Sequence, residues 1–153
     1  MNNNILEIKK INKNFQHKNG LVEIFKNVSL NIKKGSLVAL VGPSGSGKST
    51  LLNMISLIDK PTSGQIIFNS KDTKHLSEED KADIRKKNIS IIFQNNNLLT
   101  DFTALENVII PLIIKKEKVA LSKKKAEKIL TTFNLKNRQN HFPDELSGGE
   151  QQR

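Results

Sequence analysis

The sequence predicts an α/β domain that carries a helical block. One observation is a continuous apolar run at residues 37–41, which is typical of a strand buried on both faces of a sheet. A second is the glycine-rich stretch after this run, which leads into an amphipathic helix pattern at residues 48–58. A third is the change between about residues 95 and 145, where helical periodicity and capping signals replace strand patterns. The chain's 153 residues are enough for one domain with a real core.

Further strands are predicted on both sides of the apolar run. Residues 5–11 alternate between apolar and polar side chains, as a half-buried strand does. A polar turn around residues 16–20 separates them from a second strand pattern at residues 22–32. A short strand at residues 65–68 follows a Pro-Thr-Ser-Gly turn, and a second buried strand is expected at residues 89–93.

The first two helices follow from periodicity and from a capping signal. The helix at residues 48–58 is expected to carry its apolar face on Leu51, Leu52, Ile55 and Ile58. The next helix is expected from Ser77 to residue 87, because Ser77 precedes three acidic residues.

Two more helices are predicted in the helical block. Thr103 and Glu106 form a capping box, and the helix they open is expected to be kinked or to end near Pro111. Its apolar residues 108–114 are expected to be helix core, with the alternative that part of them faces a partner. A second amphipathic helix is predicted at residues 122–133.

Composition excludes several classes of function. The 25 Lys and Arg against 15 Asp and Glu give a net charge of +10, but the excess is almost entirely lysine, and Trp and Tyr are absent. Base-reading surfaces depend on arginine forks and aromatic stacking, so we expect no nucleic-acid partner. The absence of Cys excludes disulfides, cysteine-ligated zinc and a thiol nucleophile. With no apolar run near the ~20 residues of a membrane helix and no secretory signal, we expect a soluble intracellular chain.

A glycine-rich loop carries the strongest functional signal. It matches the pattern G-x-x-x-x-G-K-[ST] of P-loop NTPases through Gly42, Pro43, Ser44, Gly45, Ser46, Gly47, Lys48 and Ser49. Glycines allow the backbone N–H groups of the loop, and of the helix it opens, to approach a phosphate closely. Lys48 can reach the β and γ phosphates, and Ser49 offers a hydroxyl to Mg²⁺. The alternative is a glycine-rich turn without a ligand.

A second glycine motif ends the chain. Ser147, Gly148 and Gly149 stand at an expected helix start, where exposed N–H groups and the positive end of the helix dipole favour an anion. The alternative is a glycine-rich helix cap without a ligand. The two motifs together are hard to reach by chance.

With both motifs, the sequence resembles the ATP-binding cassette (ABC) transporter ATPases over nearly its whole length. Gly42 to Thr50 match the family's Walker A motif, and Leu146 to Arg153 match its signature motif. The resemblance implies that Gln94 is the Q-loop glutamine, which would touch Mg²⁺ or the attacking water. It also implies that Phe15 stacks on adenine, in place of the family's usual tyrosine.

Finer matches favour the lipoprotein-releasing (LolD-type) branch, near the macrolide-exporter and cell-division ATPases. They include PTSG at residues 61–64 and LLTDFTALENV at residues 98–108. The resemblance implies a nucleotide-binding core at residues 1–94 and a helical subdomain at residues 95–146 that contacts membrane subunits. Residues 147–153 would be the signature motif and the start of the following helix.

The resemblance implies an ATP hydrolase that couples ATP–Mg²⁺ to lipoprotein release at the cytoplasmic face of the inner membrane. Two copies would face head to tail, with ATP on the Walker A residues Gly42 to Thr50 of one copy. Ser147, Gly148 and Gly149 of the other copy would cap it, while Lys48 and Gln94 take part in catalysis and Ser49 and Gln94 hold the metal. Integral permease subunits would be the further partners, and the ATPase would not touch the cargo.

One departure from the family pattern concerns the end of the chain. In the family, a Walker B strand with a Mg²⁺-binding Asp and a catalytic Glu follows the signature, and a switch His comes later; the sequence stops at Arg153. The expectation is therefore a C-terminally incomplete P-loop NTPase core, inactive in hydrolysis as given. The alternatives are a related macrolide-exporter-type or cell-division ATPase, and a non-catalytic nucleotide-binding fragment.

Overall fold

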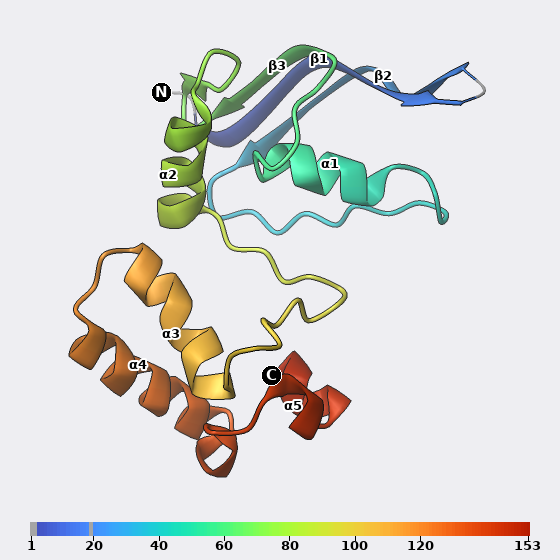
Figure 1. Cartoon of the computed structure of the whole chain (residues 1–153). Coiled ribbons are helices and arrows are strands. Elements are labelled where there is room, and N and C mark those ends of the chain that lie inside the picture. The colour runs from blue at the N-terminus through green and yellow to red at the C-terminus, as the bar shows by residue number, and fades with distance from the viewer. Residues whose placement is uncertain (1–2, 19) are drawn as a thin grey trace. The chain divides into compact units, whose positions relative to one another are not determined.

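The computed structural model describes residues 3–18 and 20–153, and it divides the chain into two compact units, Met1–Ile89 and Ser90–Arg153 (Figure 1). The first unit combines strands with helices, and the regular structure of the second is helical. This is the mixed composition that the sequence predicts. The two units are described in turn.

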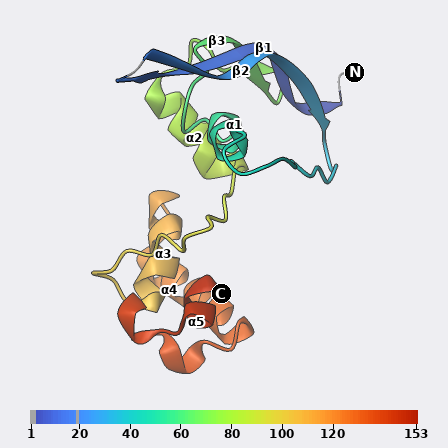
Figure 2. The ribbon, with the colours of Figure 1, turned by 90° about the vertical axis from the view of Figure 1, so that its right-hand side faces the viewer.

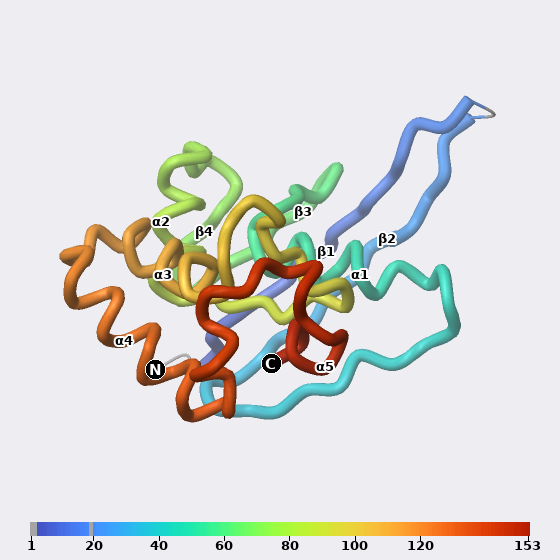
Figure 3. The backbone as a smooth tube through the Cα atoms, turned by 60° about the horizontal axis from the view of Figure 1, so that its bottom comes forward, coloured from blue at the N-terminus to red at the C-terminus, as the bar shows by residue number. Residues whose placement is uncertain are grey.

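The first unit is built on an antiparallel sheet. Its strands are β1 (Asn4–His17), β2 (Gly20–Lys33), β3 (Ser63–Phe68) and β4 (Lys71–Asp72), in the order β2-β1-β3-β4. The backbone tube shows β1 and β2 running side by side as a long hairpin (Figure 3). Three predicted strands are confirmed, each longer than expected, whereas β4 was not predicted. Asn19, in the predicted turn at residues 16–20, lies outside the described residues.

Asn12 joins the middle strand to both of its neighbours. Its side-chain oxygen accepts a hydrogen bond from the Asn27 N–H (2.9 Å), and its amide donates to Ser63 Oγ (2.8 Å). Its carbonyl oxygen accepts from the Thr62 N–H (2.8 Å). The ladder between β1 and β2 shifts register between Ile8 and Ile11, and again before Lys13, as expected where one strand holds an extra residue.

Helix α1 (Lys48–Ile55) covers one face of this sheet (Figure 2). The core cluster contains the following buried side chains from the strands, α1 and the residues after it: Leu6, Ile8, Ile11, Leu51, Met54, Leu57, Ile66 and Phe68. The predicted helix at residues 48–58 is three residues too long, because Leu57 has a left-handed φ of 58° that ends helical geometry. The predicted apolar face is also partly wrong: Leu52 and Ile58 are exposed, and Met54 and Leu57 are buried instead.

The two strands predicted to be buried do not form. Residues 37–41 are extended and unpaired, with Leu37 fully exposed and Val41 84% exposed. Residues 89–93 are also without strand structure, and Ile92 is 96% exposed. A strand buried on both faces needs neighbours at both edges and covering layers, and no strand among the described residues pairs with either segment.

Helix α2 (Glu78–Asn88) begins where its capping signal predicts. Ser77 Oγ accepts a hydrogen bond from the Asp80 N–H at the N-terminus. Arg85 Nη1 donates to the Leu57 carbonyl oxygen at 2.6 Å, which connects α2 to the residues after α1.

The second unit contains α3 (Ala104–Ile114), α4 (Val119–Thr132) and α5 (Gly148–Gln152), with short 3₁₀ turns at Lys136–Arg138 and Pro143–Glu145. Helices α3 and α4 lie side by side (Figure 1). Both predicted helices are confirmed, although α4 starts three residues before the predicted Ser122. Helix α3 does not end near Pro111 but continues to Ile114.

The apolar residues 108–114 of α3 are not core, in contrast to the first of the two expectations. None of them is buried, and Ile114 is 60% exposed. Only Ala104 of this helix is buried. None of the helices in the described ranges is long and apolar enough to span a membrane.

Candidate functional site

The glycine-rich loop connects the extended residues 37–41 to helix α1. Gly45 and Gly47 have φ angles of 79° and 88°, in the left-handed region that favours glycine. Gly47 is also sterically confined, because a Cβ there would lie 2.6 Å from Ile24 Cγ2 and 2.8 Å from the Phe25 ring. Only glycine satisfies both conditions at the position immediately before α1.

The starts of α1 and α4 have no side-chain cap, unlike the starts of α2, α3 and α5. Ser77, Thr103 and Ser147 accept a hydrogen bond from a first-turn N–H of α2, α3 and α5, whereas the N-cap Gly47 has no side chain to do so. The first-turn N–H groups of α1 therefore have no side-chain cap. Unpaired N–H groups at the positive end of a helix dipole are the donor set that a phosphate requires.

Lys48 adds the positive charge at this point. Its ammonium donates to the carbonyl oxygens of Gly42 (2.9 Å) and Pro43 (2.7 Å), which holds it over the loop. Lysine has three donors, so one N–H is left for an anion. Ser49 is exposed and Thr50 half-buried in the first turn of α1. The loop residues Gly42, Pro43, Ser44, Gly45 and Ser46 are all exposed. This donor set fits a nucleoside triphosphate with its magnesium ion.

Phe15 lies near the end of β1 and is 43% exposed. The Lys13 ammonium lies over its ring, 4.8 Å from the ring centroid. Lys13 in turn forms an ion pair with Asp59 at 2.6 Å. Neither Lys13 nor Asp59 belongs to a predicted motif. The available signal was the alternation of β1, which places Lys13 on the same face as the buried Ile11.

Gln94 lies in the second unit and is exposed, in irregular structure instead of at a strand end. It lines an open hollow together with Asn95, Thr100 and Gln151. Gln94 and Ser49, the two predicted metal ligands, therefore belong to different units.

The signature residues form the start of α5. Ser147 Oγ accepts from the Glu150 N–H (3.3 Å), and Glu150 Oε2 accepts in return from the Ser147 N–H and Oγ–H, both at 2.8 Å. This reciprocal capping box leaves Gly148 and Gly149 exposed, and an added Cβ at either would meet nothing within 4 Å.

Arg138, at the end of the 3₁₀ turn Lys136–Arg138, supports the capping box. Its Nε donates to Glu150 Oε1 at 2.8 Å. This guanidinium, followed by the Ser147 backbone and hydroxyl donors, lowers the pKa of the Glu150 carboxyl to about 2. The carboxylate therefore stays ionised at neutral pH and holds the turn that presents both glycines.

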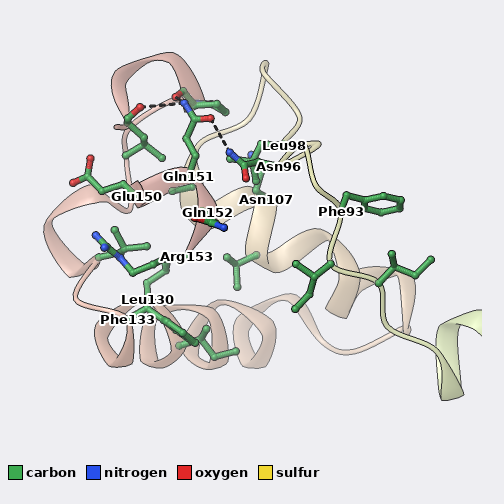
Figure 4. A pocket seen from close by; sticks show the side chains of 18 residues that line it. Phe93, Asn96, Leu98, Asn107, Leu130, Phe133, Glu150, Gln151, Gln152 and Arg153 are labelled. Carbon is green, nitrogen blue, oxygen red and sulfur yellow. Dashed lines mark hydrogen bonds between the residues drawn. The ribbon is translucent and has the colours of Figure 1, made fainter. Parts of the chain in front are cut away.

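An apolar pocket of about 270 Å³ lies between this motif and α3 and α4 (Figure 4). Phe93, Leu130 and Phe133 line it, and Gln151 lies at its edge. The Gln151 amide donates to the carbonyl oxygens of Pro143 (2.7 Å) and Leu146 (3.1 Å), and its oxygen accepts from Asn96 Nδ2 (3.2 Å). Gln151 thus connects α5 to the segment that follows Gln94.

Comparisons with known proteins agree with these motifs. A family model described as "ABC transporter" matches residues 25–153. The lipoprotein-releasing system ATP-binding protein LolD of Wigglesworthia glossinidia brevipalpis is 43% identical over the whole chain, which covers 67% of that protein.

Two solved structures are also similar. One is the dimeric ATP-binding cassette MJ0796 bound to ADP and Pi, with 39% identity, a TM-score of 0.87 and coverage of 95% of this chain and 65% of that one. The other is cbiO1 from Clostridium perfringens, with 26% identity, a TM-score of 0.75 and coverage of 99% and 59%. The chain spans about two thirds of the length of the relatives it matches.

Proposed function

The chain belongs to the ABC transporter family, and on that basis we propose that it is the ATP-binding part of a transporter that releases lipoproteins from the inner membrane. The observation that carries the nucleotide assignment is the start of α1: a glycine without a side-chain cap, left-handed loop glycines and the Lys48 ammonium. The lipoprotein assignment depends on the 43% identity to LolD over the whole chain.

In this proposal the phosphate loop binds and orients. The N–H groups of residues 44–50 surround the β and γ phosphates of ATP, and Lys48 neutralises part of their charge. The Ser49 hydroxyl and the Gln94 side chain would hold Mg²⁺, which neutralises charge on the phosphate oxygens. Phe15 stacks on the adenine base through its exposed ring. Residues 1–94 would thus form the nucleotide-binding core.

A second copy of the chain would complete the site. MJ0796, the similar cassette, was solved as a dimer bound to ADP and Pi. Gly148 and Gly149 are exposed and have open space where a side chain would be, so a phosphate could approach their backbone closely. We propose a head-to-tail homodimer in which Ser147, Gly148 and Gly149 of one copy cap the nucleotide of the other.

The helical residues 95–146 would contact the membrane subunits. Helix α3 presents Ile113 (44% exposed) and Ile114 (60% exposed), and Val119 and Leu121 at the start of α4 are also exposed. An apolar surface of this kind on a helical unit suits a partner helix. The protein would then work at the cytoplasmic face of the inner membrane without touching the cargo.

The test is titration of the chain with Mg-ATP by calorimetry. Lys48→Ala removes a charge-assisted contact to phosphate, for which a loss of roughly tenfold or more in affinity is expected. Lys34→Ala, an exposed lysine in the turn after β2, is the matched control and should leave the affinity unchanged. Equal affinities of the wild type and Lys48→Ala would contradict the phosphate-loop assignment.

Gly149→Asp distinguishes nucleotide binding by one copy from nucleotide-driven dimerisation. A carboxylate at this position would face the phosphates only across the dimer, where two unit charges at 4 Å repel by about 4 kcal/mol at an effective dielectric constant of 20. The variant should therefore bind Mg-ATP as a monomer within about twofold of wild type but fail to dimerise with nucleotide. If it loses monomer affinity as fully as Lys48→Ala, the signature acts within one chain and the head-to-tail arrangement is wrong.

A further inference from the structure

Lys13 is a buried cation beside the expected base-binding ring. The residue is only 7% exposed. Its ammonium forms an ion pair with Asp59 Oδ2 at 2.6 Å and donates to the Lys60 carbonyl oxygen at 2.9 Å. A lysine is almost never buried without such partners, because desolvating an unpaired ammonium is costly. Both partners fix the position of its Nζ atom.

The same ammonium lies over the ring of Phe15. The distance from Nζ to the ring centroid is 4.8 Å, within the range of a cation–π interaction. Lys13 and Phe15 are two residues apart on β1 and so share one face of the strand. Phe15 has no hydrogen-bonding group in its side chain, so no polar bond can hold the orientation of its ring. The cation supplies an interaction that depends on that orientation.

Asp59 connects this arrangement to the phosphate loop. It follows α1 by four residues, and its N–H donates to the Asn53 carbonyl oxygen in that helix at 3.2 Å. The ion pair therefore links the strand that carries Phe15 to the helix that begins at the phosphate loop. Both parts lie in the same compact unit, Met1–Ile89.

We propose that Lys13 is a positioning residue for base recognition. Held by Asp59, its ammonium occupies one side of the Phe15 ring and keeps the exposed side available for stacking on the base of a nucleotide. A cation also withdraws π-electron density from the ring, which favours stacking against an electron-rich purine. Lys13 thereby gives the site affinity for the base as distinct from the phosphates. This inference rests on the proposed nucleotide site.

The experiment compares two ligands that share phosphates and differ in the base. Wild type and Lys13→Met are titrated with Mg-ATP and with Mg-tripolyphosphate, and the ratio of the two affinities is the readout. Lys13→Met should weaken ATP binding roughly three- to tenfold and leave tripolyphosphate binding unchanged. Lys9→Met is the control, because it removes a cation and an ion pair with Glu7 from the same strand. Among the described residues, the Lys9 ammonium has no aromatic ring beside it.

A double-mutant cycle tests whether the effect passes through the ring. In a Phe15→Leu background, Lys13→Met should change the affinity ratio by less than about twofold. Asp59→Asn, which keeps the shape of the side chain, should also lower the ratio of ATP affinity to tripolyphosphate affinity. This variant replaces Lys13→Met in the experiment if Lys13→Met does not fold. Restoration of the ratio by Lys13→Arg would support the cationic role.

Three outcomes are decisive. If Lys13→Met weakens both ligands equally or neither, or if its effect on the ratio persists in the Phe15→Leu background, the inference is wrong and the ion pair is structural. If wild type binds neither ligand, the proposed nucleotide site itself fails. If wild type binds both ligands with the same affinity, the base is not recognised and the inference fails while the phosphate loop stands.

Discussion

Each of the two units is stabilised by a different kind of interaction. In Met1–Ile89, eight buried apolar side chains from the sheet, α1 and the residues after it form one cluster, with Ile8 1% and Ile11 0% exposed. In Ser90–Arg153, fewer apolar side chains are buried, and much of the order comes from polar side chains at helix ends. Asn107 alone bonds to backbone atoms of Leu99, Phe102 and Thr103.

The difference predicts which changes destabilise each unit. Burial of apolar area is insensitive to pH and is lost when a side chain is truncated. Capping bonds depend on particular oxygen atoms and on the ionisation of carboxylates. Three pairs of variants test this contrast.

The largest effect is expected in the sheet core. Ile8→Ala removes a side chain that is 1% exposed and leaves a cavity between the sheet and α1, at a cost of about 2–5 kcal/mol in the free energy of unfolding. Ile113→Ala in α3 removes the same atoms from a residue that is 44% exposed and should cost no more than about 0.5 kcal/mol. Urea denaturation measures the free energy of unfolding of both variants. Similar costs for the two variants would remove the contrast between the units.

A smaller effect is expected at the start of α3. Thr103→Ala removes the oxygen that accepts from the Glu106 N–H and should cost about 0.5–2 kcal/mol. Thr131→Ala is the matched control: its hydroxyl only donates back to the Glu127 carbonyl oxygen within α4, so its loss should be neutral or stabilising. Urea denaturation again provides the measurement, and a Thr131→Ala cost as large as that of Thr103→Ala would contradict the capping argument.

The smallest effect is expected at Glu150 and depends on pH. The Arg138 guanidinium and the Ser147 donors lower the pKa of Glu150 from 4.5 to about 2. A lowered pKa in the folded state stabilises the protein above the unfolded pKa, and this contribution is lost as pH falls from 4.5 to about 2. Glu150→Gln should therefore lower the unfolding midpoint near pH 6 by an amount that disappears near pH 2.

An NMR titration of the Glu150 carboxyl provides the direct check. Arg138→Gln removes the largest cause of the shift and should raise the pKa of Glu150 toward its ordinary value. A pKa of Glu150 that is unchanged by Arg138→Gln would show that the Ser147 donors alone hold the carboxylate.

Local signals were predictable, and signals that depend on distant partners were not. Ser77, Thr103 and Ser147 mark three helix starts, because a cap is made within a few residues of the chain. The runs at residues 37–41 and 89–93 were predicted as buried strands and form no strand. An apolar run indicates a need for burial but not which strands supply it, and Leu37 and Ile92 are almost fully exposed. The Lys13–Asp59 ion pair joins residues 46 positions apart, and no local pattern could indicate it.

The same distinction applies to the candidate site. The left-handed glycines of the loop and its capless helix start follow from the motif itself. The role of Gln94 remains a prediction, because Gln94 and Ser49 belong to different units. The roles of Ser147, Gly148 and Gly149 also remain predictions, because they depend on the approach of a second copy. The ion pair that holds the Lys13 ammonium beside the Phe15 ring joins β1 to the residues after α1, so it depends on a tertiary contact that no local pattern encodes.

The hydrogen bonds from Asn12 to both neighbouring strands have a consequence for the register of the sheet. A strand that slides by two residues keeps every side chain on its face, so the alternating pattern alone opposes such a slip only weakly. Asn12 makes side-chain bonds to Asn27 on β2 and Ser63 on β3, and its carbonyl oxygen accepts from Thr62 just before β3. A slip in either direction would break contacts to both neighbours at once. Asn12 therefore fixes the register of β1, and with it the position of Phe15 three residues further along the strand.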